Sequence, residues 1–194
     1  PTHPHEEMEI ITIVLDGEMT HKDSMGNKTV IKAGDVQRMS AGTGLTHSEF
    51  NLANKGVHFY QIWILPDTAK LTPSYDQKSF EPRDWINCLL PVASGQNLPG
   101  TVTFHTDATI YRCALDNGKS VSHEKTLGRR LFVYLMDGQI TVNENVLKTE
   151  DQARIDIEDP LSLEAQKDSE FILIDVPSCK GWGYDAETLR GGKK

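Results

Sequence analysis

The sequence has no long apolar run. None of its hydrophobic stretches reaches the roughly 20 residues that a helix needs to cross a bilayer. Its first residues also lack the basic-then-apolar pattern of a signal peptide. We therefore expect no membrane segment and a cytoplasmic location. Cysteine is scarce as well: Cys88, Cys113 and Cys179 lie far apart without CxxC spacing. This argues against a disulfide framework and a cysteine zinc site, so we expect reduced thiols with structural roles.

Positive charge is also in short supply. The formal net charge is −8, and the only basic clusters are Arg129–Arg130 and Lys193–Lys194. Such a surface does not hold a phosphate backbone electrostatically, so direct nucleic-acid binding is not expected. The 194 residues, 38% of them hydrophobic, are enough for one large domain or two small ones with a sizeable core.

Sustained helical periodicity is absent. Short apolar runs alternate with Gly, Asp, Asn and Pro, which indicates an all-β fold. Residues 23–27 (DSMGN) are typical of a hairpin turn, and residues 74–85 of an irregular or helical linker. The predicted strands cover residues 8–15, 18–22, 28–32, 36–39, 57–65, 101–104, 110–115, 131–136, 139–143, 153–157 and 170–176.

An internal repeat connects the two halves of the chain. IVLDGEMT at 13–20 returns as VYLMDGQIT at 133–141, each an apolar strand, an Asp-Gly turn and a second strand. Downstream, KAGDVQRMSAG at 32–42 has a weaker echo in KTEDQARIDIE at 148–158. Two similar β units in one chain predict a duplicated sandwich.

The N-terminal segment is rich in groups that bind metals. His3, His5 and Glu9 share the parity that, in an extended chain, directs side chains to one face. A single HxH motif on a strand is more often a solvent-facing or hydrogen-bonded pair than a ligand pair. A second cluster is therefore needed to support a metal site.

That second cluster is GTGLTHSEFN. His47 and Glu49 lie two residues apart, and Gly42 and Gly44 before them permit a tight backbone path. Three neutral imidazoles with one or two carboxylates suit Fe(II), Ni(II), Mn(II) or Zn(II) and leave positions open for substrate. The absence of cysteine disfavours a structural zinc site.

Residues 1–75 resemble the first cupin domain of the pirin family, especially its bacterial members of quercetinase type. The HPH motif at 3–5, the AGTG loop at 41–44 and the HSE motif at 47–49 occur in the order and spacing of the family, and the QIWILP run at 61–66 is included. The rest of the chain shows a weaker resemblance. Pirins carry a further segment before HPH, so we expect that this segment is missing here.

The resemblance implies two cupin domains in tandem, each a jelly-roll β-sandwich. The expected boundaries are a metal-binding cupin at 1–75, a linker at 76–100, and at 101–194 a C-terminal cupin without a metal site, plus a tail. In the second domain the positions matching the HSE motif are expected at Leu163 and Ala165 or their neighbours.

The resemblance also implies the metal ligands. Carried over motif by motif, they are His3, His5, His47 and Glu49 around one divalent ion, usually iron. General cupins use the glutamate of the first motif instead, which leaves Glu9 as a supporting residue or an alternative ligand. The residues suit nickel, manganese and zinc as well.

Three functions follow from this interpretation. The first is quercetin 2,3-dioxygenase chemistry, in which O2 opens a flavonol ring, carbon monoxide and a depside leave, and Glu49 acts as general base. The second is an iron-dependent regulator that binds a protein partner without turnover, and the third a metal-free cupin that binds a sugar or another small ligand. A monomer is expected, since the two halves can cover each other.

The remaining histidines and tryptophans have structural interpretations. Outside the two motifs, His58 and His105 are expected to pack or to lie at the surface. The same is expected of His21, which can also line the pocket, and His123 is interpreted as a surface or partner-binding residue. Trp63 is expected in the core of the first sandwich, on a strand that can also supply a pocket wall. Trp85 and Trp182 are expected to anchor the linker and the tail, and Cys113 to be buried.

Overall fold

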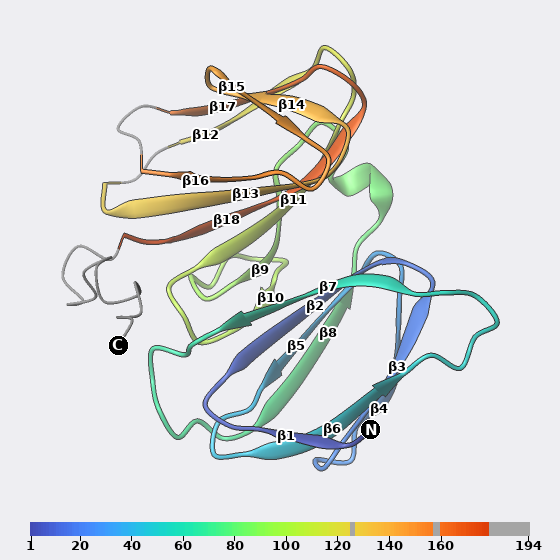
Figure 1. Ribbon diagram of the computed structural model, residues 1–194. Coiled ribbons are helices and arrows are strands. Elements are labelled where there is room, and N and C mark those ends of the chain that lie inside the picture. The colour runs from blue at the N-terminus through green and yellow to red at the C-terminus, as the bar shows by residue number, and fades with distance from the viewer. Residues whose placement is uncertain (125–126, 157–159, 179–194) are drawn as a thin grey trace, which may run out of the picture.

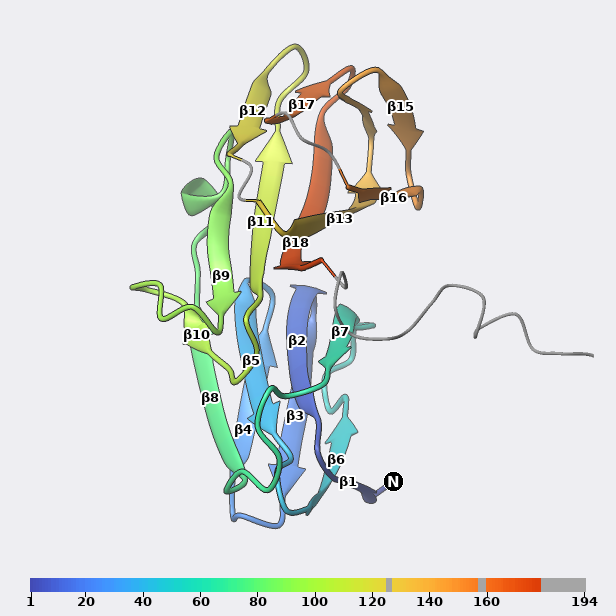
Figure 2. The same cartoon turned by 90° about the vertical axis from the view of Figure 1, so that its left-hand side faces the viewer.

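The computed structural model describes residues 1–124, 127–156 and 160–178. It is built almost entirely of β-strands, which form two β-sandwich units stacked end to end (Figures 1 and 2). The one helix in the described part is the short 3-10 turn η1 (Pro82–Asp84), so no helix there is long and apolar enough to cross a membrane. The all-β prediction is confirmed. Predictions for Cys179, Trp182 and the terminal lysines lie outside the described residues.

The first unit consists of two four-stranded antiparallel sheets. One sheet has the strand order β1 (His3–His5), β6 (Leu45–Phe50), β3 (Glu18–Asp23) and β4 (Lys28–Lys32). The other has the order β7 (His58–Ile64), β2 (Glu9–Asp16), β5 (Asp35–Ser40) and β8 (Ser74–Ser79).

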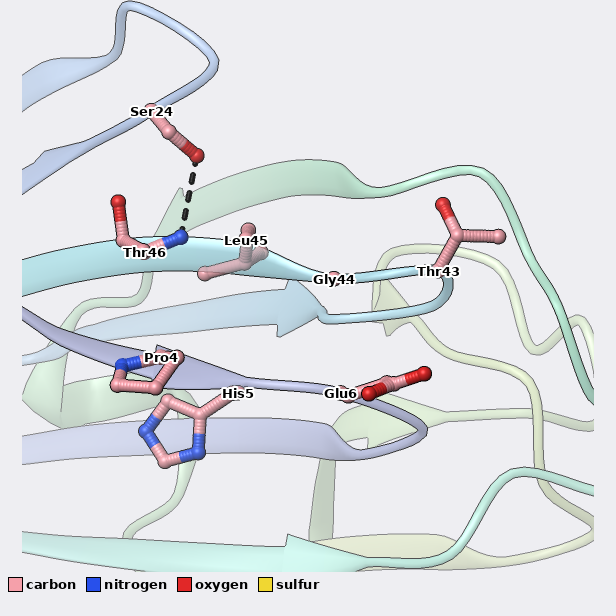
Figure 3. A pocket seen from close by; sticks show the side chains of 8 residues that line it. All are labelled: Pro4, His5, Glu6, Ser24, Thr43, Gly44, Leu45 and Thr46. Carbon is pink, nitrogen blue, oxygen red and sulfur yellow. Dashed lines mark hydrogen bonds between the residues drawn. The ribbon is translucent and has the colours of Figure 1, made fainter.

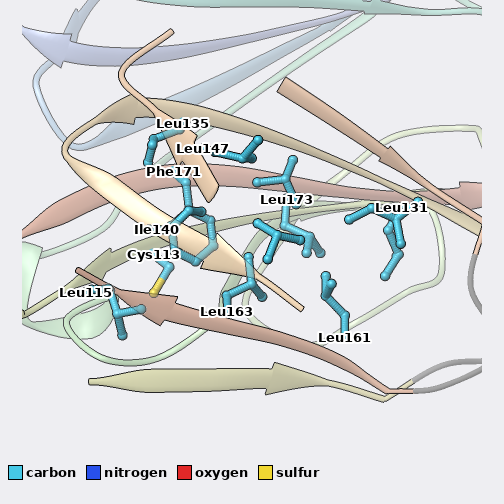
Figure 4. Close-up of a cluster of buried hydrophobic side chains, with 14 residues drawn as sticks. Cys113, Leu115, Leu131, Leu135, Ile140, Leu147, Leu161, Leu163, Phe171 and Leu173 are labelled. Atoms are coloured by element: carbon cyan, nitrogen blue, oxygen red, sulfur yellow. The ribbon is translucent and has the colours of Figure 1, made fainter. Parts of the chain in front are cut away.

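The second unit repeats this plan. Its smaller sheet has the order β12 (Ser120–His123), β17 (Leu161–Ala165), β14 (Gln139–Val142) and β15 (Asn145–Lys148). Its larger sheet has the order β10 (Val102–Thr103), β9 (Leu90–Ser94), β11 (Thr109–Leu115), β18 (Ser169–Pro177), β13 (Arg129–Asp137) and β16 (Gln152–Ile155). Buried side chains including Cys113, Leu163 and Phe171 fill the space between the two sheets (Figure 4).

The sequence repeat corresponds to a structural repeat. Gly17 joins β2 to β3 and Gly138 joins β13 to β14, and both glycines have a positive φ that an L side chain rarely adopts. The pairing of β2 with β7 shifts register between Val14 and Asp16, and that of β13 with β18 between Leu135 and Asp137. The same irregularity therefore precedes the same turn in both units, as expected for a duplicated sandwich.

Strand β2 is buried on both faces, which explains its apolar sequence. Ile10 and Val14 point into the first sandwich, where they pack against side chains of the facing sheet. Ile11 and Ile13 point the other way and join a cluster with Ile110 of the second unit. The two units therefore share a hydrophobic cluster, and a strand buried on both faces needs an unbroken apolar run.

The segment expected to be irregular or helical is partly a strand. Residues 74–79 form β8, which pairs antiparallel with β5. The sequence SYDQKS looks like a loop because its inward side chains are polar. Tyr75 donates to Gln77 Oε1 at 2.8 Å, and Gln77 Nε2 donates to Asp35 Oδ2 at 2.9 Å. Trp85 is buried after η1, as predicted, with the Arg112 guanidinium over its ring.

Candidate metal centre

Three imidazole rings converge at one end of the first sandwich. Strand β1 pairs with β6 so that His3 lies opposite His47, and His5 follows on the same face of β1. The ring centroids are 4.8 Å apart for His3 and His5, 4.4 Å for His3 and His47, and 5.0 Å for His5 and His47. The convergence predicted from the two sequence motifs is therefore present.

The nitrogen positions fit a shared metal ion. His3 Nε2 and His47 Nε2 are 3.0 Å apart. Two nitrogens each about 2.1 Å from one ion, at a right angle, lie about 3.0 Å from each other. The same spacing suits an N–H···N hydrogen bond when no ion is bound. His5 Nε2 is buried and has no hydrogen-bond partner among the described residues. Buried nitrogens with free lone pairs are what a metal requires.

Two of the rings, those of His5 and His47, are held toward the neutral form that binds metals. Burial, together with the neighbouring His3, His21 and His5, lowers the pKa of His47 from 6.5 to about 4, although Asp23 acts in the opposite direction. Burial likewise lowers the pKa of His5, with a contribution from His3. His47 therefore carries no proton on its lone pair at neutral pH.

Glu49 lies beside His47 but turns toward a different neighbour. Ligand atoms of Glu49, His47 and His21 all lie within 4.8 Å of one another, and a separate group of the same tightness contains His3, His5 and His47. The structure thus brings the three predicted histidines together and places the predicted glutamate in an adjoining group, with His47 common to both.

A short chain of hydrogen bonds orients Glu49. Gln61 Nε2 donates to Oε1 and Oε2 of Glu49 at 3.1 and 3.0 Å. Trp63 Nε1 donates to Gln61 Oε1 at 2.9 Å, which fixes the amide so that its NH2 group faces the carboxylate. Sequence reasoning did not identify Gln61, because a single glutamine within a strand carries no motif.

Trp63 does not lie in the core of the first sandwich as predicted. Its side chain is 55% exposed and packs edge-on against His5, with ring centroids 5.1 Å apart. Along β7, Tyr60 and Ile62 face the second unit, whereas Gln61 and Trp63 face the histidines. Trp63 therefore forms a wall of the site, the other role such a strand can have.

The structure does not bring Glu9 to the histidines. The chain leaves β1 through Glu7, whose φ of 49° breaks the extended path, so the alternation counted from His3 does not continue to Glu9. The Glu9 carboxylate is fully buried on the other sheet, where Ser40 Oγ donates to it at 2.8 Å and His105 Nδ1 lies 3.1 Å away. Neither metal-capable group includes Glu9.

The AGTG loop gives the site its shape. A Cβ on Gly42 would collide with the carbonyl oxygen of Leu71, and the positive φ of Gly42 disfavours other residues. The loop borders a hollow of about 540 Å³. In Figure 3, which draws its lining residues, His5 lies below the strand that carries Thr46. The amide of Thr46 donates to Ser24 Oγ at 3.1 Å. Of the predicted ligands, His5 lines this hollow and His3, His47 and Glu49 do not.

The second unit lacks the corresponding ligands. His123 lies opposite Leu161 as His3 lies opposite His47, and Leu163 lies opposite Val142 on the strand that matches β3. The matching positions are therefore Leu161 and Leu163, two residues earlier than predicted, and both are buried in the core. Both metal-capable groups found among the described residues belong to the first unit.

His123 was predicted to be a surface or partner-binding residue, and the structure shows that it is largely covered. Its side chain is 12% exposed and its Nε2 lies 3.7 Å from Asp175 Oδ2. The ring packs edge-on against Tyr111, with centroids 5.2 Å apart. The remaining predictions for single histidines agree with the structure, since His58 is exposed and the His105 side chain is 43% exposed.

Two family models match the chain. Residues 1–64 match Pirin, and residues 91–176 match the quercetinase C-terminal cupin domain. The two models together cover most of both sandwich units, and each matches one of them.

Proteins of known sequence or structure match nearly the whole chain. It is 40% identical over 177 residues to the quercetin 2,3-dioxygenase of Escherichia coli K12, covering 91% of this chain and 75% of the relative. A pirin-like protein of Caulobacter vibrioides is 36% identical over 91% of this chain and 76% of its own length. The crystal structure of the bacterial pirin YhhW from Escherichia coli in complex with nickel(II) superimposes with a TM-score of 0.85 at 38% identity, covering 92% of this chain and 76% of that one.

Proposed function

Because the chain belongs to the pirin family, with two cupin sandwiches in tandem, we propose that it is a metal-dependent dioxygenase that opens a flavonol-like ring with O2. The observation that carries the proposal is the convergence of His3, His5 and His47 beside the carboxylate of Glu49. Relatives named quercetin 2,3-dioxygenase and the nickel complex of a bacterial pirin support it.

In this proposal His3, His5, His47 and Glu49 hold one divalent metal ion. Three imidazoles and a carboxylate suit Fe(II), which we propose as the native ion, and equally Ni(II), Mn(II) and Zn(II). Once bound, such an ion lowers the pKa of a substrate hydroxyl and holds its oxygen.

Glu49 is the proposed general base. Its two oxygens accept from Gln61, which keeps the carboxylate beside His47 and leaves lone pairs free for a further proton or ligand. A carboxylate held in this way can take the proton that a flavonol hydroxyl loses. Trp63, half exposed beside His5, offers an aromatic surface against which the flavonol rings can pack.

Oxygen consumption with quercetin tests the proposal. Protein loaded anaerobically with Fe(II), Ni(II) or Mn(II) is expected to consume O2 and release carbon monoxide when quercetin is added. The metal-free protein and the His47→Ala variant are expected to do neither. Loaded protein that binds one ion per chain and leaves quercetin and O2 unchanged would contradict the dioxygenase proposal and favour the metal-dependent regulator.

A further inference from the structure

A fifth side chain in the first unit is built like a metal ligand. We propose that His21, oriented by Asp23, is an additional donor to the metal on the side of Glu49. The inference rests on the proposed function, since it assumes that the three other histidines hold an ion. It goes beyond the residues of the HPH and HSE motifs, and it gives a role to a residue that the sequence suggested only for packing or for lining the pocket.

The hairpin turn after β3 locks the carboxylate of Asp23. Oδ1 of Asp23 accepts from the backbone amides of Met25 and Asn27 at 2.9 and 3.0 Å, and Oδ2 accepts from Asn27 Nδ2 at 2.7 Å. All three of these contacts come from N–H donors, which favour the ionised carboxylate and fix its orientation. Asp23 is therefore an ionised, immobile acceptor.

This acceptor decides which nitrogen of His21 carries the proton. His21 Nε2 lies 3.0 Å from Asp23 Oδ2, and both side chains are fully buried. Because an ionised carboxylate only accepts, Nε2 must be the protonated nitrogen, and in the neutral ring Nδ1 keeps its lone pair. A histidine that donates one ring N–H to a carboxylate and offers the other nitrogen is the usual arrangement of a metal-bound histidine.

The free nitrogen of His21 has no hydrogen-bond partner in the described part of the chain, and the ring lies beside Glu49 and His47. His21 Nδ1 is buried without a hydrogen-bond partner among the described residues. Strand pairing places His21 directly opposite Glu49, and one ring nitrogen of His21 lies within 4.8 Å of ligand atoms of Glu49 and His47. The Tyr75 ring, with its centroid 5.0 Å from that of His21, packs beside the imidazole and limits its movement.

Two variants test this assignment by metal binding. His21→Phe keeps a ring of similar shape against Tyr75 and removes the nitrogen donor, and Asp23→Asn removes the charge that sets the tautomer. We expect His21→Phe to lower the affinity for Ni(II), measured by competition with a chelator, by at least about tenfold. Both variants should change the visible absorption spectrum of the Co(II)-loaded protein, which reports the number and kind of donors. The matched control is His58→Phe, an exposed histidine outside both groups.

The outcomes separate this inference from the proposed function. If both variants have the Ni(II) affinity and the Co(II) spectrum of the wild type, the assignment of His21 is overturned. The proposed metal centre is still supported in that case, provided that His47→Ala loses metal binding. If His47→Ala also binds like wild type, the proposed metal centre itself is wrong. Should His21→Phe fail to fold, Asp23→Asn gives the same spectral readout with a change of charge only.

Discussion

Replacing His47 by alanine is expected to abolish tight metal binding. His47 is the one residue common to both metal-capable groups, and its Nε2 lies 3.0 Å from His3 Nε2. Losing a direct ligand costs more than losing a supporting residue, for which about 10- to 100-fold in affinity is typical, so we expect a loss of more than about 100-fold. Isothermal titration of the metal-free protein with Ni(II) measures the effect.

His58→Ala is the control for this experiment. His58 is an exposed histidine on β7 that belongs to neither group, so its loss should leave the affinity for Ni(II) unchanged. The account would be contradicted if both variants bound Ni(II) with the wild-type constant, because the convergent rings would then have no part in metal binding.

Replacing Ile11 by alanine is expected to destabilise the whole chain. Ile11 is fully buried in the cluster that β2 shares with the second unit. Truncating a buried isoleucine to alanine costs about 2–5 kcal/mol in the free energy of unfolding. Since the cluster contains side chains of both units, we expect the two units to lose stability together, in one shifted denaturation curve followed by circular dichroism in urea.

A control variant and a second measurement on Ile11→Ala test that prediction further. Val30→Ala alters a side chain that is 42% exposed and should change the free energy of unfolding by less than about 0.5 kcal/mol. Ile11 faces away from the histidines, so the folded Ile11→Ala protein should keep the wild-type affinity for Ni(II). Separate transitions for the two units, with only one of them shifted, would show that the shared cluster does not couple them.

The sequence predicted the parts of the structure that depend on local pattern. The Asp-Gly turns at Gly17 and Gly138 stand out because such turns need residues that tolerate positive φ. The shared face of His3 and His5 also followed, because the HxH spacing in an extended strand directs both side chains to one side. These features need only a few neighbouring residues to be recognised.

Other parts depend on pairing between distant strands and were missed. The strand β8 has polar inward residues, whose partners on β4 and β5 cannot be read from SYDQKS itself. His21 resembles any strand histidine until β6 places Glu49 opposite it and the turn locks Asp23 beside it. The sequence did contain one signal for this role of His21: in the THKD run, the histidine stands two residues before an aspartate that begins a turn.

Alternation along a strand also has limits as a guide. It holds only while the chain stays extended, and Glu7 interrupts it between His3 and Glu9. The weak repeat in the second half fixed its register only to within two residues, so Leu163 and Ala165 were proposed where the strand pairing gives Leu161 and Leu163. The boundaries at residues 75 and 100 remain predictions. The intervening segment contains strands that belong to the sheets of both units.

The most direct test of the central claim is to locate the metal. Crystals of the Ni(II)-loaded protein, measured at the nickel absorption edge, give an anomalous difference map. We expect a single strong peak per chain between the rings of His3, His5 and His47 and beside Glu49. A peak elsewhere, or none in protein shown to contain one equivalent of nickel, would contradict the account.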